Sequence, residues 1–146
     1  MNTQKITSNK QQTYPLSLTY TRQQQQNIQR TVIRRANPDK VALPTLDGLV
    51  FEKVRNIIYL EAQGNYTYIH MAGNKKFLVC KTLRQVEEGI RTDSFVRVHR
   101  SYTINMLLLT RYIKGKGGYV IMEDGSTVNV SAGRKKAFME AVEILF

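Results

Sequence analysis

From Leu43 onward the chain alternates short β-type segments with turn-forming residues, and this pattern restricts the fold more than any other feature. Runs rich in β-branched and aromatic residues are separated by Asp47-Gly48, Gly64-Asn65, Ala72-Gly73-Asn74 and Asp124-Gly125. Such turns tolerate the positive φ angles that tight hairpins require. The pattern predicts a mainly β fold of antiparallel strands, at residues 43–46, 49–52, 57–62, 66–71, 76–80, 95–99, 112–113, 119–122 and 127–130.

Two short helices are expected within this β-rich region. The first starts at Thr82, which forms a capping-box pattern with Gln85 ahead of apolar residues at helical spacing. The second follows Ser131, a candidate N-cap, and its apolar residues repeat at i, i+3, i+4 and i+7. Those residues are Phe138, Ala141, Val142 and Leu145.

The N-terminal segment, residues 1–42, differs in composition from the remainder, residues 43–146. The first 43 residues hold eight of the ten glutamines and seven of the 22 Lys and Arg residues, with one acid, Asp39. Because the segment lacks a sustained hydrophobic period, we expect a disordered basic tail ahead of a folded domain. An alternative is a short basic helix at residues 22–35, used for docking or dimer contacts.

The net charge of +11 points to a polyanionic partner, either nucleic acid or an anionic membrane surface. No apolar run approaches the ~20 residues of a spanning helix, and the polar N-terminus shows no signal-peptide core. A single cysteine, Cys80, excludes a disulfide framework within one chain. These features together predict a cytoplasmic protein.

Catalytic and metal-binding patterns are weak in this sequence. The two histidines occur without HxxxH, CxxC or DxD spacing, and no phosphate-loop motif follows any expected strand. Ser101 lies two residues from His99, but no orienting acid or oxyanion pocket is apparent beside them. We therefore expect no enzyme activity, no metal, no cofactor and no small-molecule substrate.

Polar side chains that bond phosphates and base edges concentrate in three expected linkers, at residues 63–67, 99–103 and 131–136. The third linker also offers backbone N–H groups at a helix N-terminus, which favour anions. Each has an ordinary alternative. Asn65 can be a turn former, His99 a satisfied core histidine, Lys135 and Lys136 a solvated helix face, and Arg100 a surface ion pair with Asp93 or Glu88.

Six blocks stand in order along the sequence: IIYLEA (57–62), NYT (65–67), TL (82–83), FVRVHRSY (95–102), IN (104–105) and VS (130–131). Together they resemble LytTR-type DNA-binding domains, the output domains of many bacterial response regulators. The resemblance covers residues 43–146 and implies an elongated, mostly β domain that inserts loops into successive major grooves. It implies base contacts from Asn65, Tyr66, Thr67, His99, Arg100, Ser101, Ser131 and Arg134.

Two features depart from the family pattern. Ala132 and Gly133 stand where the family often carries Arg-Arg or Arg-Asn, so Arg134 or Lys135 would have to supply the long donor there. Such domains also usually follow a phosphoacceptor receiver domain, which the basic, Gln-rich N-terminal segment is too short to form. Regulation by phosphorylation within this chain is therefore not expected.

The sequence thus predicts specific binding of double-stranded DNA and regulation of transcription, and a second copy on an adjacent half-site would fit the family. The alternative is a basic module that binds acidic proteins or membrane surfaces without sequence preference. RNA binding is disfavoured because no RRM-like or KH-like signature is present.

Overall fold

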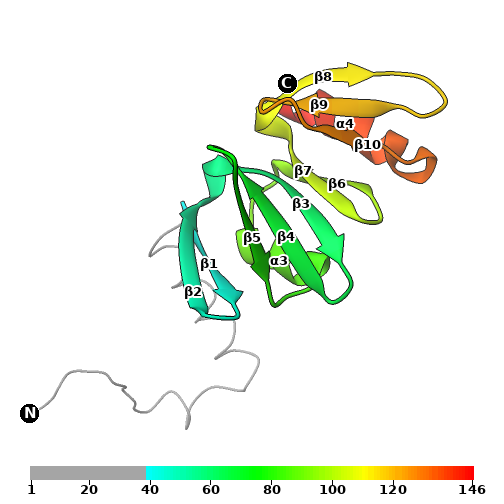
Figure 1. The fold of residues 1–146 in the computed structure, drawn as a ribbon. Coiled ribbons are helices and arrows are strands. Elements are labelled where there is room, and N and C mark those ends of the chain that lie inside the picture. Colours follow the sequence, from blue (N-terminus) through cyan, green and yellow to red (C-terminus); the bar gives the residue numbers. More distant parts are fainter. Residues whose placement is uncertain (1–38) are drawn as a thin grey trace, which may run out of the picture. The chain divides into compact units, whose positions relative to one another are not determined.

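The computed structural model describes residues 39–146, which form antiparallel sheets and two α-helices joined by short 3₁₀ turns (Figure 1). The expected mainly β fold with two helices is confirmed. The expected tail and its alternative basic helix lie outside the described residues, apart from residues 39–42. Strand β1 spans Lys40–Thr45 and so begins three residues before the expected boundary, because Val41 packs against the buried core.

The largest sheet has five strands in the order β5-β4-β3-β7-β6, all antiparallel to their neighbours. Its strands are β3 (Ile57–Gln63), β4 (Tyr66–Met71), β5 (Lys75–Val79), β6 (Phe95–His99) and β7 (Tyr102–Asn105). Tyr102 and Thr103, the first half of β7, were expected in the polar linker at residues 99–103. Strand β7 instead lies inside the sheet, and its buried polar side chains bond distant partners. The Asn105 amide, for example, donates to the Ile57 carbonyl at 3.0 Å.

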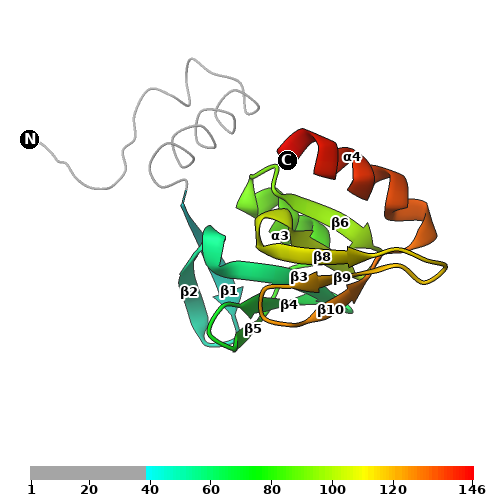
Figure 2. The ribbon, with the colours of Figure 1, turned by 90° about the horizontal axis from the view of Figure 1, so that it is seen from above.

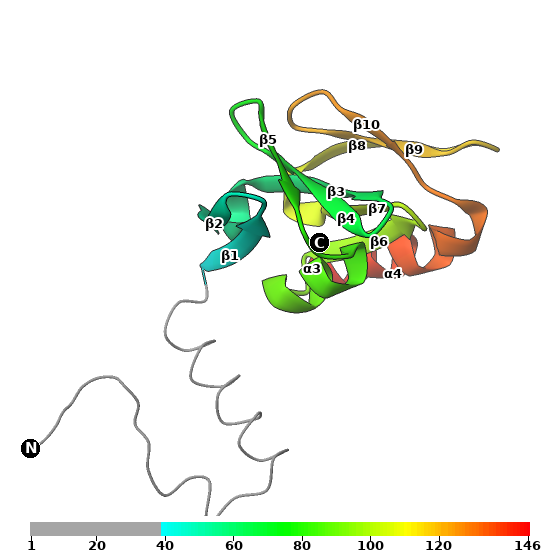
Figure 3. The same cartoon turned by 60° about the horizontal axis from the view of Figure 1, so that its bottom comes forward.

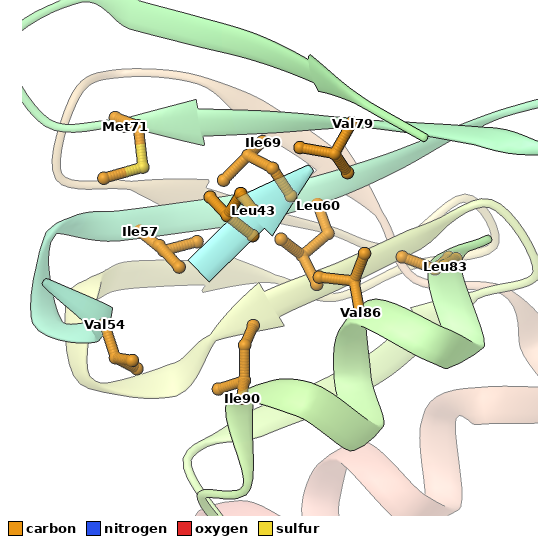
Figure 4. Packing of buried hydrophobic residues seen from close by; sticks show 10 residues of the cluster. All are labelled: Leu43, Val54, Ile57, Leu60, Ile69, Met71, Val79, Leu83, Val86 and Ile90. Carbon is orange, nitrogen blue, oxygen red and sulfur yellow. The ribbon is translucent and has the colours of Figure 1, made fainter. Parts of the chain in front are cut away.

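Helix α3 (Leu83–Ile90) covers one face of the five-stranded sheet. The expected capping box is present: the Thr82 hydroxyl accepts the Gln85 N–H, and the Gln85 side chain accepts the Thr82 N–H. The apolar side of the helix is buried against strand residues, as Figure 4 shows. This first core cluster contains Leu43, Val54, Ile57, Leu60, Ile69, Met71, Val79, Leu83, Val86 and Ile90.

The hairpin of β1 and β2 (Gly48–Lys53) is a separate two-stranded sheet closed by the expected Asp47-Gly48 turn. It lies beside β5, where the Cys80 N–H donates to the Pro44 carbonyl at 2.8 Å. The 3₁₀ turn η2 (Val54–Asn56) then leads into β3. The hairpin is therefore at the sheet edge opposite β6.

A third sheet comprises β8 (Leu109–Ile113), β9 (Tyr119–Met122) and β10 (Thr127–Asn129), and 3₁₀ turn η3 (Met106–Leu108) connects it to β7. It lies on the opposite side of the five-stranded sheet from α3 (Figure 3). Helix α4 (Lys135–Leu145) follows 3₁₀ turn η4 (Ala132–Arg134) and runs alongside β6 (Figure 2). Phe138 of α4 is buried in a second core cluster with residues of β6, β7, β9 and β10. No helix within residues 39–146 has the length and apolar character to cross a membrane.

Candidate nucleic-acid interface

The three polar segments noted in the sequence meet at one end of the five-stranded sheet. The Ala62 N–H, near the end of β3, donates to the Ser101 carbonyl in the β6–β7 turn at 2.8 Å. The Ser131 N–H donates to the Val98 carbonyl near the end of β6, also at 2.8 Å. Since the Gly64-Asn65 turn directly follows β3, the structure brings together segments separated by more than sixty positions in the sequence.

The β3–β4 turn presents two of its three expected site residues to solvent. Gly64 takes a left-handed conformation (φ 59°), which a residue with a Cβ adopts rarely. Asn65 is exposed, and Tyr66 is 44% exposed. Thr67 is fully buried, and its hydroxyl donates to the Lys81 carbonyl at 2.8 Å. Its expected contact with a base does not fit this position; the hydroxyl instead holds β4 to the segment before α3.

The β6–β7 turn consists of Arg100 and Ser101 between His99 and Tyr102, which pair across the two strands. The half-buried His99 accepts the Ser101 N–H at Nδ1 (3.1 Å), and its ring lies 5.5 Å from that of Tyr102. Its imidazole thus fixes the turn while one edge stays accessible.

Arg100 is exposed, and its guanidinium has no hydrogen bond or ion pair within residues 39–146. Of the two acids considered as its partners, Glu88 pairs with Arg84 at 3.5 Å instead. In the described part of the chain, Asp93 forms no ion pair. Arg100 therefore keeps its full hydrogen-bonding capacity for a ligand.

The third segment differs in detail from the expected helix start. The Ser131 side chain makes no capping hydrogen bond; its carbonyl accepts the Arg134 N–H at 3.0 Å and closes the turn η4. Helix α4 consequently begins at Lys135, with Arg134 at the N-cap position. The expectation that Ser131 caps the last helix is wrong, because three residues of 3₁₀ turn intervene. Arg134 and the Ala132-Gly133 pair are exposed.

The loop between β8 and β9 adds two further cations that the sequence did not single out. The Lys135 ammonium donates to the Gly115 carbonyl at 3.2 Å, which holds the β8–β9 loop beside the start of α4. Lys114 and Lys116 of this loop are exposed. We call Lys114, Lys116, Arg134, Lys135 and Lys136 the basic cluster. In the sequence, the sign of a cationic loop was that Lys114 and Lys116 are separated by one glycine and have no acidic residue nearby.

A polar and aromatic group lies on the sheet face behind the β6–β7 turn. The Glu61 carboxylate lies 2.8 Å from His70 Nε2, and the His70 ring stacks on Tyr59 at 4.0 Å. Burial, followed by the charge of Glu61 and a hydrogen bond to it, raises the pKa of the Tyr102 phenol. Burial also raises the pKa of Tyr59, opposed in part by a hydrogen bond with Ser126.

These raised pKa values predict a loss of stability in alkali. Above about pH 10 the unfolded chain releases its phenolic protons first, so the free energy of unfolding should fall as pH rises towards the folded-state pKa. Tyr102→Phe and Tyr59→Phe should each make this decline shallower when urea unfolding is followed from pH 8 upward. The exposed Tyr66→Phe variant is the matched control and should keep the wild-type slope. Identical slopes in all variants would contradict the burial of these phenols.

The chain is similar to several known proteins. Residues 47–143 match the family model described as the LytTr DNA-binding domain. The CO-responsive transcriptional regulator RcoM of Rhodospirillum rubrum is 33% identical over 96 residues, which are 65% of this chain and 40% of that protein. The sensory transduction protein LytT of Bacillus subtilis is 28% identical over 115 residues, which are 75% of this chain and 46% of that protein.

The fold is also similar to that of a solved domain. The structure described as the LytTr DNA-binding domain of a methyl-accepting/DNA response regulator from Bacillus cereus matches with a TM-score of 0.62 and 25% identity. The match covers 71% of this chain and 96% of that domain. The chain spans less than half the length of the two curated relatives. By its sequence match and its fold, this chain belongs to the family of LytTr DNA-binding domains.

Proposed function

We propose that this domain binds double-stranded DNA at a preferred sequence and thereby regulates transcription. The observation that carries the proposal is the convergence of three polar segments at one end of the sheet, with Arg100 exposed and unpaired among the described residues. Two similar proteins support it: one is named a CO-responsive transcriptional regulator and the other a sensory transduction protein.

The proposed interface divides base readout from phosphate binding. Arg100, with Asn65, Tyr66, His99 and Ser101 beside it, contacts base edges in the major groove. The planar guanidinium of arginine matches the O6 and N7 acceptors of guanine, and the amide of asparagine matches adenine. Hydrogen bonds to Ser101 join the β6–β7 turn to His99 and to β3.

The basic cluster binds the phosphate backbone beside the β3–β4 and β6–β7 turns, which contact the bases. Its five cations lie around the start of α4, and none forms an ion pair within residues 39–146. Ala132 and Gly133 offer no long side chain to a base, so in this proposal Arg134 and Ser131 anchor the third segment to phosphate more than they read sequence.

Selection from fragmented genomic DNA tests the proposal. The purified chain should enrich a common motif, and a duplex with this motif should compete at least about 10³-fold better than random duplex at physiological salt. A repeated motif would indicate a second copy on an adjacent half-site. Equal competition by all duplexes would refute sequence-specific binding and favour the alternative of a basic module for acidic proteins or membranes.

The basic cluster should account for part of the salt dependence. Replacing Lys114 and Lys116 by glutamine should lower the slope of log affinity against log salt by up to about 0.9 for each phosphate that the variant no longer neutralises. The preference for the selected motif should persist, because these side chains meet only phosphate in the proposal. The measurement is a salt titration with selected and random duplexes.

The matched control removes the same charge from the β1–β2 hairpin, at the opposite edge of the sheet. Lys40 and Lys53 are exposed there and stand opposite each other on β1 and β2. Their replacement by glutamine should leave the salt slope close to the wild-type value. An equal effect of the two double variants would show that only net charge matters.

A further inference from the structure

Arg97 of β6 lies close to the β6–β7 turn, and its side chain points to α3 rather than to solvent. Its Nε and Nη2 donate to the two carboxylate oxygens of Glu87, at 2.9 and 3.1 Å. The side chains are only 22% and 26% exposed, and the Thr103 hydroxyl contacts both. A bidentate guanidinium–carboxylate pair in a half-buried site has a defined geometry.

The same guanidinium also reaches the turn. Arg97 Nη1 donates to the Arg100 carbonyl at 3.1 Å. Strand β6 carries a register shift between Arg97 and His99, which brings Arg97 opposite Thr103 and leaves His99 opposite Tyr102. The Arg97 side chain therefore connects α3, β7 and the backbone of Arg100.

The polar backbone groups of the turn are thereby held from three directions. Arg97 holds the Arg100 carbonyl, His99 Nδ1 holds the Ser101 N–H, and the Ala62 N–H holds the Ser101 carbonyl. Two-residue turns on a sheet edge are ordinarily mobile, since few contacts fix them. This turn is fixed before any ligand arrives.

The charge of Arg97 is already neutralised where it lies. Both of its forked nitrogens face the Glu87 carboxylate, and the remaining terminal nitrogen bonds the turn. A phosphate contact would require breaking a bidentate pair that is partly shielded from water. Arg97 is therefore suited to hold the β6–β7 turn and not to contact DNA.

We propose that Arg97, held by Glu87, is a positioning residue that sets sequence specificity through the turn bearing Arg100 and Ser101. The inference rests on the proposed function of the interface. Its physical basis is that a preorganised side chain loses less conformational freedom on binding and discriminates more sharply between correct and incorrect bases. Neither Arg97 nor Glu87 touches DNA in this scheme.

The first test needs no DNA. Arg97→Lys keeps the charge but lacks the planar fork that reaches both the carboxylate and the turn carbonyl. Backbone NMR order parameters at residues 100 and 101 should fall from about 0.85 towards 0.6 or below. Arg84→Lys is the matched control, because Arg84 pairs with Glu88 on the same helix and makes no contact with the turn. Unfolding temperatures identify any variant that is not folded.

The second test uses Glu87→Gln, which leaves Arg97 in place but removes the carboxylate that holds it. The preference for selected over random duplex should fall roughly tenfold. Loss of one negative charge should tighten binding to every duplex slightly, as it does in the Glu88→Gln control. If Arg97 were instead a phosphate contact, Glu87→Gln would bind all DNA more tightly and would keep the wild-type preference. Glu88→Gln, the control, should keep the wild-type preference.

The outcomes separate this inference from the proposed function. A wild-type chain without sequence preference would refute the proposed function, while the order parameters would still decide whether Arg97 positions the turn. Rigid turns in both Arg97→Lys and Glu87→Gln would overturn the inference even if the wild-type chain proves sequence-specific. Mobile turns with an intact preference would show that positioning does not set specificity, and would overturn it as well.

Discussion

Phe138→Ala is expected to lower the free energy of unfolding by about 3–5 kcal/mol, the usual cost of truncating a buried phenylalanine. Phe138 is 1% exposed in the second core cluster, and its ring lies 5.1 Å from that of Tyr112. The side chain joins α4 to β6 and to the third sheet, so the cavity cannot close without moving the helix. Domains of this size have a total stability of roughly 5–15 kcal/mol, and urea unfolding should show a large shift of the midpoint.

Ile144→Ala on the same helix provides the control. Ile144 is 81% exposed, so its truncation should change stability by no more than about 0.5 kcal/mol. Similar midpoints for Phe138→Ala and wild type would mean that α4 does not pack on the sheets in solution. The basic cluster would then lack the helix start that organises it.

Arg100→Ala is expected to weaken binding to the selected duplex by roughly 1–3 kcal/mol, with little change on random duplex. Arg100 is exposed, unpaired within residues 39–146, and carried on a turn whose backbone is held by Arg97, His99 and Ala62. A base contact from this position should relax the preference at one base pair only. Competition titrations with duplexes mutated at single positions measure that effect.

Arg55→Ala separates a base contact from a general loss of charge. Arg55 is exposed in η2, at the opposite end of β3 from the readout turns. Its replacement should affect selected and random duplexes equally and weakly. An equal loss on all DNA for Arg100→Ala, with a lower salt slope, would assign Arg100 to the phosphate backbone. Unchanged affinity for both duplexes would remove Arg100 from the interface.

Elements that depend on neighbouring residues were correctly predicted. The Asp47-Gly48 hairpin turn and the Thr82–Gln85 capping box are formed by residues at most three positions apart. Of the apolar residues named for the last helix, Phe138 is buried, whereas Ala141, Val142 and Leu145 are only half-buried. Such signals are local, because backbone conformation and capping involve groups within one turn of the chain.

Elements that depend on distant partners could not be predicted in the same way. Tyr102 and Thr103 of β7 were expected in a polar linker, yet Thr103 and Asn105 are buried and bonded to Glu87 and to the carbonyl of Ile57. Thr67 was expected to contact a base, but it is buried and its hydroxyl donates to the Lys81 carbonyl. A buried polar group is stable only with a partner, and here the partners lie 14 to 48 positions away.

Arg97 and Arg100 show what the sequence determined and what only the tertiary structure decided. The sequence by itself determined the family, the strand and turn pattern, and the segments that carry hydrogen-bonding residues. The family resemblance assigned a base contact to Arg100 and gave no role to Arg97, three positions earlier. The tertiary structure made one a half-buried partner of Glu87 and left the other exposed. The physical reason is that α3 packs on the sheet and places the Glu87 carboxylate within reach of Arg97, whereas no carboxylate of residues 39–146 pairs with Arg100.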